Sequence, residues 1–81
     1  MILLPTKHLH SDRALITVGG IILRNVRTPI AFSELWRKTR DGYRRQNLSP
    51  LAYDVFLLAL AMLYALRAID YDSGVIRRVA P

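Results

Sequence analysis

The chain has 81 residues, of which 52 % are hydrophobic, so it is long enough for one small domain and too apolar for a disordered tail. It contains no cysteine, which excludes a disulfide framework and a thiolate metal site. Twelve Lys and Arg residues against six Asp and Glu give a net charge of +6, which favours contact with nucleic acid or with an acidic protein surface.

The N-terminal part predicts a short strand followed by a helix. Met1–Leu4 is typical of an extended segment, closed by Pro5, which disfavours helix in the residue before it. A helix is expected from Ser11 or Asp12, since either side chain can cap the free N–H groups, to about Val26.

One apolar stripe with helical spacing runs along this first helix, formed by Leu15, Val18, Ile22 and Val26, with Arg13, Thr17 and Arg24 opposite. Gly19 and Gly20 lie in mid-helix, where each costs about 1 kcal/mol relative to Ala. We therefore expect the two glycines to let another backbone approach closely.

The segment Arg27–Pro29 breaks the first helix, and a second is expected from about Phe32 to Arg40. Asp41 and Gly42 are interpreted as its stop signal. The residues expected to face inward are Phe32, Leu35, Trp36 and Thr39.

A third helix is predicted from Ser49 and Pro50, which form a cap and a first-turn proline, through the apolar run that ends at Leu66. After it, Ala68–Asp72 and Val75–Val79 are two β-prone runs around a turn that contains Gly74, which is typical of a hairpin.

The predicted fold class is α+β, mainly α, with residues 1–81 in a single domain. The order of short N-terminal strand, three helices and C-terminal β-hairpin is that of a winged helix-turn-helix, in which the third helix usually faces DNA and the hairpin is the wing.

The third helix carries two apolar stripes rather than one. The first stripe consists of Leu51, Val55, Leu58, Met62 and Leu66, and the second, opposite, of Tyr53, Phe56, Leu57, Leu60 and Tyr64. A helix on a small core should be apolar on one side only. The two stripes therefore indicate a protein partner on one of them, against the alternative that both are core, and they leave open which stripe faces outward.

Neither stripe offers the Arg, Lys, Asn or Gln side chains that read base edges in the major groove. The charged residues of this region are Asp54, which phosphate would repel, and Arg67 at the far end. Sequence-specific DNA reading by the third helix is therefore not expected.

A basic set is a second candidate contact, and arginine predominates over lysine in it. It consists of Arg37, Lys38, Arg40, Arg44 and Arg45, together with Arg77 and Arg78 on the wing. Three interpretations stay open: contact with a phosphate backbone, pairing with carboxylates of a protein partner, or a solvated surface without a ligand.

We expect no metal site, no catalytic activity and no cofactor. His8, His10 and Asp12 lack the further ligand that zinc usually needs. The serines are explained by caps and turns, and no pair of carboxylates lies in an apolar setting. We expect a protein that is not an enzyme.

A cytoplasmic location without membrane contact is the expectation. Met1–Pro5 is too short for a secretory signal and lacks a preceding basic residue. The longest apolar run, Val55–Leu66, has twelve residues, whereas crossing a bilayer takes about 18 or more.

Several segments resemble the small middle components of ABC-three-component systems, and the similarity covers nearly the whole chain. The first of them is Met1–His8, and its part Leu4–His8 is the most specific. The others are Asp12–Leu15, Val18–Gly19, Phe32–Trp36, Leu57–Leu60 and Gly74–Arg78.

This resemblance implies an accessory subunit that bridges a coiled-coil ATPase of the structural-maintenance-of-chromosomes and Rad50 type and an effector, often a nuclease. The setting it implies is Lamassu-type defence against phage and plasmids, with DNA sensed by the complex. It carries over no catalytic residue. The leading hypothesis is therefore a non-catalytic adaptor, and the alternative is a small basic winged-helix DNA-binding regulator.

Overall fold

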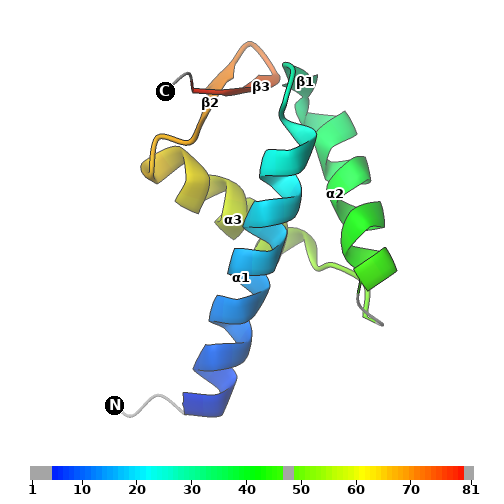
Figure 1. Cartoon of the computed structure of the whole chain (residues 1–81), viewed down its shortest axis with the longest axis vertical. Helices are drawn as coiled ribbons and strands as arrows, with labels where there is room; N and C mark the ends of the chain where they lie inside the picture. The colour runs from blue at the N-terminus through cyan, green and yellow to red at the C-terminus, as the bar shows by residue number, and fades with distance from the viewer. Residues whose placement is uncertain (1–4, 47–48, 80–81) are drawn as a thin grey trace.

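The computed structural model describes the backbone of residues 5–46 and 49–79 and the side chains of residues 13–46 and 49–79. The elements are, in chain order, α1 (Pro5–Asn25), β1 (Ile30–Ala31), α2 (Phe32–Gln46), α3 (Tyr53–Ala65), β2 (Ile69–Asp72) and β3 (Val75–Arg78) (Figure 1). Three helices and one three-stranded antiparallel sheet confirm the mainly helical α+β class.

The predicted hairpin is confirmed, and β3 is the middle strand of the sheet, in the order β1-β3-β2. Ser73 and Gly74 both have positive φ, 52° and 81°, which is the conformation of a two-residue turn whose twist suits the strands it joins. The Phe32 N–H donates to the Gly74 carbonyl at 3.0 Å, so the start of α2 is tied to this turn.

The strand that joins the hairpin is β1, in a segment that sequence reasoning treated only as a break between helices. Ile30 pairs with Ile76, and Ala31 with Val75. The strand expected at Met1–Leu4 lies outside the described residues.

The start predicted for the first helix, at Ser11 or Asp12, is wrong: α1 already begins at Pro5. Proline is accepted in a first turn because the N–H that it lacks would have no helical partner there. The expected end is nearly right. The Asn25 side-chain N–H donates to the Ile21 carbonyl at 3.0 Å, and the Val26 N–H donates to the Leu23 carbonyl at 3.3 Å.

The end predicted for the second helix is also wrong, since α2 continues through Asp41 and Gly42 to Gln46. Gly42 is buried against α1: a Cβ on it would lie 3.2 Å from the Ile21 Cγ2. The glycine therefore serves close packing of two helices and does not end one.

The third helix begins at Tyr53, with Ala52 as its N-cap, so Ser49 and Pro50 do not start it. The cap residue has extended backbone and no capping side chain, but Asp54 places a negative charge in the first turn, where the helix dipole favours it. The α3 helix ends in a Schellman arrangement: the Ala68 N–H donates to the Leu63 carbonyl at 2.8 Å.

The core lies where α1 meets both α2 and α3 and where the sheet covers one end of the helices (Figure 1). The predicted stripe on α1 is confirmed, because Val18, Ile22 and Val26 are fully buried and Leu15 packs against them. The predicted inward residues of α2 are confirmed as well, since Leu35 and Thr39 are fully buried and Phe32 and Trp36 pack on the core.

Phe56 of α3 is the centre of an aromatic cluster in this core. Its ring centroid lies 5.8 Å from that of Phe32 and 5.0 Å from that of Trp36, and both partners belong to α2. Gly19 of α1 receives a side chain of α3 and not a backbone: a Cβ there would lie 3.2 Å from the Met62 methyl.

Candidate protein-binding surface

One side of α3 is apolar and exposed. We call it the outer strip, and it consists of Asp54, Leu57, Leu58, Ala61, Tyr64 and Ala65, all of them exposed. The side chains of Leu58 and Tyr64 are 56 % and 60 % exposed. Residues three and four apart lie side by side on a helix, so these six form one continuous surface whose only charge is that of Asp54.

The predicted partner-binding stripe is divided by the structure. Leu51 is buried in the core at 6 % exposure, so it is not available to a partner. Val55 and Met62 are half-buried against the core, whereas Leu58 and Leu66 are exposed, Leu66 at 68 %.

The opposite stripe is divided in the same way. Phe56 and Leu60 are buried, while Tyr53, Leu57 and Tyr64 are exposed. The reason is the rotation of the helix: its most buried line, through Ala59 and Leu63, passes between the two predicted stripes. The outer strip also lies between them, on the other side of the helix.

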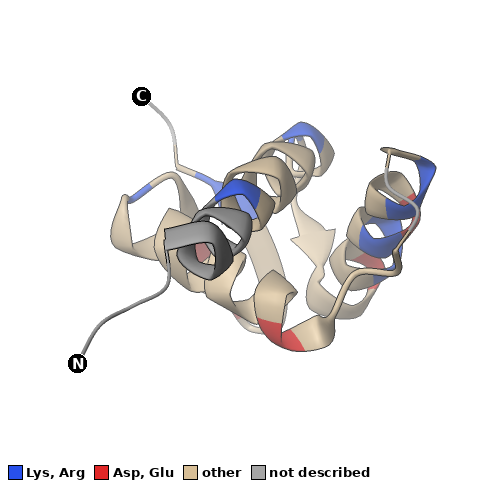
Figure 2. Cartoon of the chain, turned by 90° about the horizontal axis from the view of Figure 1, so that it is seen from below, with Lys and Arg blue, Asp and Glu red and all other residues tan. Residues whose placement is uncertain are grey.

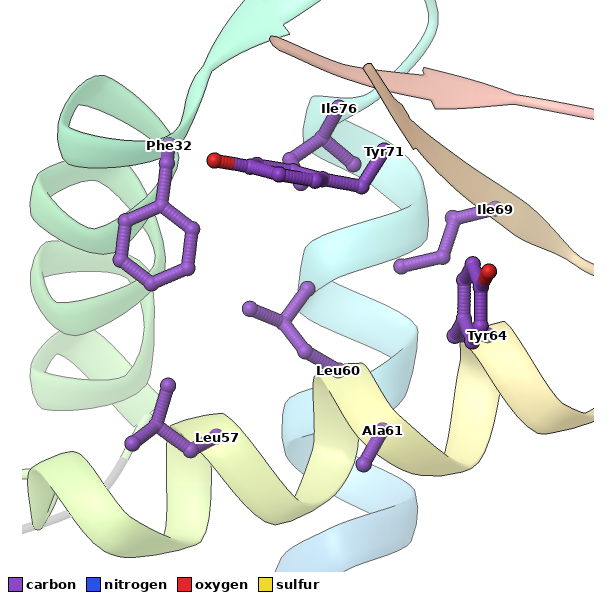
Figure 3. Close-up of a pocket in the computed structure, with 8 residues that line it drawn as sticks. All are labelled: Phe32, Leu57, Leu60, Ala61, Tyr64, Ile69, Tyr71 and Ile76. Atoms are coloured by element: carbon purple, nitrogen blue, oxygen red, sulfur yellow. The ribbon is translucent and has the colours of Figure 1, made fainter. Parts of the chain in front are cut away.

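An apolar groove adjoins the outer strip, between α3, the sheet and the start of α2 (Figure 3). Its volume is about 410 Å³, and it is lined by Phe32, Leu57, Leu60, Ala61, Tyr64, Ile69, Tyr71 and Ile76. Figure 3 shows the Tyr71 ring reaching from β2 across the groove toward Phe32. The side-chain polar atoms of this lining are the two tyrosine hydroxyls.

Sequence reasoning missed this groove because its walls come from elements that are distant along the chain. One signal was present: in β2, Ile69 and Tyr71 alternate with two aspartates, which indicates a strand with one apolar face. Leu57, Ala61 and Tyr64 belong to both the groove and the outer strip, which makes the two one continuous apolar surface.

The basic residues of α2 form two groups. Arg37 donates from Nε to Glu34 at 3.3 Å and lies 3.8 Å from the Asp41 carboxylate. The hydrogen bond from Arg37 lowers the pKa of Glu34 below its ordinary value, and the same bond raises the pKa of Arg37. Arg40 stacks over the Trp36 ring, with its guanidinium carbon 5.6 Å from the ring centroid.

Lys38, Arg44 and Arg45 make up the second group. All three are exposed, and none forms an ion pair with an acidic residue of the described chain. Figure 2 shows several basic positions along α2. These three cations are therefore the part of the predicted basic set that is available to an external anion.

The wing arginines are engaged within the chain. Arg77 lies 3.9 Å from the Asp70 carboxylate and 3.6 Å from that of Asp72. Arg78 donates to the backbone carbonyl of Leu23, near the end of α1. The wing therefore does not add two free cations to the basic surface of α2.

Among the described side chains, no group of three or more His, Cys, Asp and Glu is placed to hold a metal ion. His8, His10 and Asp12 have side chains outside the described residues. None of the helices in the described part of the chain has the length and hydropathy to cross a membrane.

The family model described as ABC-three component (ABC-3C) system Middle Component 6 matches residues 4–79. Neither a curated protein nor a solved structure matches the chain significantly. The family match spans all described helices and strands, so the surface described above belongs to the matched region.

Proposed function

The chain belongs to the family of ABC-three-component system Middle Component 6, and we propose that it acts in such a system as a non-catalytic adaptor subunit. Membership in a multi-component system implies protein partners. The observation that carries the proposal is the continuous apolar surface of the outer strip and the groove, which no described residue of the chain covers. Exposed contiguous apolar surface on a small protein marks an interaction site.

The arrangement of elements supports a winged-helix identity for this adaptor. A helix, a short strand, two more helices and a hairpin follow one another, and the short strand pairs with the hairpin. In DNA-binding winged helices, the side chains on the exposed face of the third helix read bases. Here that face is the outer strip, whose leucines, alanines and tyrosine suit a protein surface and lack base-reading groups.

The partners that we propose are an ATPase of the structural-maintenance-of-chromosomes and Rad50 type and an effector, in Lamassu-type defence a nuclease. A subunit between two proteins needs two separate surfaces. The outer strip with its groove supplies an apolar one, and Lys38, Arg44 and Arg45 on α2 supply a basic one. Carboxylates on one partner would complement the second surface.

A non-catalytic role is supported by the chemistry of the groove. Its walls carry two tyrosine hydroxyls and otherwise hydrocarbon. Among the described residues, no nucleophile with an adjacent base and no pair of carboxylates lines the groove. Its lining therefore suits an apolar side chain better than proton transfer.

The adaptor role is tested by co-purification of the chain with the other two components of its system, expressed together. Leu58→Asp places a charge in the middle of the outer strip and is expected to abolish the complex. The matched control is Ile16→Asp, because Ile16 is 71 % exposed and belongs to α1, which contributes no residue to the strip. Recovery of the complete complex with Leu58→Asp would refute this use of the strip.

Duplex binding by the basic surface of α2 is a second candidate function. Its support is that Lys38, Arg44 and Arg45 are exposed and form no ion pair with an acidic residue of the described chain. If these residues contact phosphates, affinity for duplex DNA falls steeply with salt concentration, and neutralising all three makes the dependence shallower. A gel-shift titration that shows no binding at low salt removes this candidate.

A further inference from the structure

We propose that the protein seated on the outer strip is a second copy of this chain, packed with its α3 antiparallel to the first. This inference rests on the proposed function, in that it takes the outer strip as a protein contact. At the strip it replaces the ATPase or effector by a second copy, so the adaptor enters its assembly as a pair. The ATPase and the effector then bind the two basic surfaces of that pair, one on each copy.

The first argument is the symmetry of the strip about Ala61. Two antiparallel helices related by a twofold axis bring residue 61 − n of one copy opposite residue 61 + n of the other. Leu57 then meets Ala65 of the second copy, and Leu58 meets Tyr64. A large side chain lies opposite a small one in the first pair, and an aliphatic one opposite an aromatic in the second, with the small Ala61 at the axis where the backbones come closest.

The second argument is charge complementarity at the two ends of the strip. Asp54 lies in the first turn of α3 and Arg67 just after its last turn, and both are exposed without an ion pair in the described chain. In the antiparallel arrangement, Asp54 of each copy lies near Arg67 of the other. The pairing forms twice and leaves the strip with no net charge.

The third argument is the backbone of Arg67. It has a φ of 61°, in the left-handed region, at the position after the helix where glycine is usual. A side chain with a Cβ is disfavoured there. An arginine at a position where glycine would be less strained indicates that its side chain has a role. Pairing with Asp54 of the second copy is such a role.

The remaining charge of the chain does not oppose this contact. The exposed cations of α2 without an ion pair in the described chain, Lys38, Arg44 and Arg45, belong to a helix that contributes no residue to the strip. A contact between two α3 helices therefore leaves these cations uncovered, and the basic surfaces of both copies stay accessible to other partners.

The experiment is sedimentation equilibrium of the purified chain over about 1 µM to about 1 mM, the range in which a contact of modest size dissociates. We expect the mass to rise from 9.3 kDa toward twice that value, and Leu58→Asp to stay monomeric throughout. Asp54→Arg and Arg67→Asp should each weaken the dimer about tenfold, because each brings two pairs of like charges together. The double variant should restore the affinity to within about threefold of the original.

Arg67→Gly adds an independent measurement on the same residue. It should raise the thermal midpoint of the monomer, since glycine accepts positive φ, and weaken the dimer, since the guanidinium is lost. A purely structural role of Arg67 would move only the midpoint.

The results separate this inference from the proposed function. A monomer at every concentration overturns the pairing of two copies, and the co-purification of Leu58→Asp then decides the adaptor role alone. A dimer that the reversed charge pair does not rescue overturns the antiparallel arrangement. If the chain never dimerises but Leu58→Asp still abolishes the complex, this inference is refuted and the adaptor role is supported.

Discussion

Replacing Thr39 by valine should stabilise the protein. Thr39 lies on the inward side of α2, is fully buried, and its hydroxyl has no hydrogen-bond partner among the described residues. A buried hydroxyl of this kind has lost its water without a replacement. Valine has nearly the same shape and puts a methyl group where the hydroxyl was.

The magnitude follows from two terms with the same sign. An unpaired buried hydroxyl costs about 1–3 kcal/mol. A buried methyl group contributes about 0.8 kcal/mol. Threonine and valine have similar helix propensities, so the backbone term is small. The two terms add up, so we expect the free energy of unfolding to rise by about 2–4 kcal/mol. For a domain of this size, each kcal/mol raises the thermal midpoint by about 4–8 °C.

Urea unfolding followed by circular dichroism measures this change. Thr39→Ser is the matched control, because it keeps the hydroxyl and removes the methyl group; it should lower stability by about 1 kcal/mol. If Thr39→Val is instead the less stable variant, the hydroxyl has a hydrogen-bond partner in solution, and the reasoning from its burial is refuted.

Gly20→Ala should raise the free energy of unfolding by about 1 kcal/mol, because a Cβ there would meet nothing nearer than a flexible arginine tip at 3.9 Å. Gly42→Ala should stabilise the protein less than Gly20→Ala or should destabilise it, because its Cβ would lie 3.2 Å from buried Ile21. Urea titrations in which Gly42→Ala is the more stable of the two variants would contradict this packing. The pKa of Glu34 is lowered by its hydrogen bond with Arg37, so the stabilisation is present above the ordinary pKa of 4.5 and is lost as the pH falls through the lowered value. Thermal midpoints from pH 6 down to about pH 3 should therefore fall less steeply for Glu34→Gln than for the original chain, by a small amount because both side chains are exposed.

The parts of the fold that sequence reasoning predicted well depend on local patterns. The hairpin around Ser73 and Gly74 follows from two β-prone runs and a turn, and the structure has it at the expected residues. The inward side of α2, with Leu35 and Thr39, follows from helical spacing alone.

The errors arise where a local signal is overridden by packing between distant elements. Gly42 is a common stop residue, yet α2 continues through it because Ile21 of α1 requires the space that a side chain would fill. Ser49 and Pro50 are good helix-start residues, yet α3 starts at Tyr53, after Leu51 has entered the core. Neither contact can be derived from the neighbouring residues in the sequence.

Only part of the candidate surface could be predicted from the sequence, because its position depends on packing between distant elements. That α3 is more apolar than one small core requires can be stated from composition alone. Which side stays exposed depends on the rotation of the helix, and this is set by α1 and the aromatic cluster around Phe56. As a result, the exposed line runs between the two predicted stripes, through Ala61.

The fold explains why the outer strip stays uncovered. The inner side of α3 is occupied by α1, and the hairpin that follows α3 is held to β1 and to the start of α2 by its strand pairing and by the Phe32–Gly74 hydrogen bond. The hairpin therefore reaches only one edge of the outer strip, where Ile69 and Tyr71 line the groove together with Tyr64. No other described element is free to turn onto α3, so a second polypeptide is the remaining way to remove this apolar surface from water. Half of the chain's net charge of +6 lies on α2, where five basic residues outnumber two acidic ones. Repulsion there opposes unspecific association without interfering with a specific contact at α3.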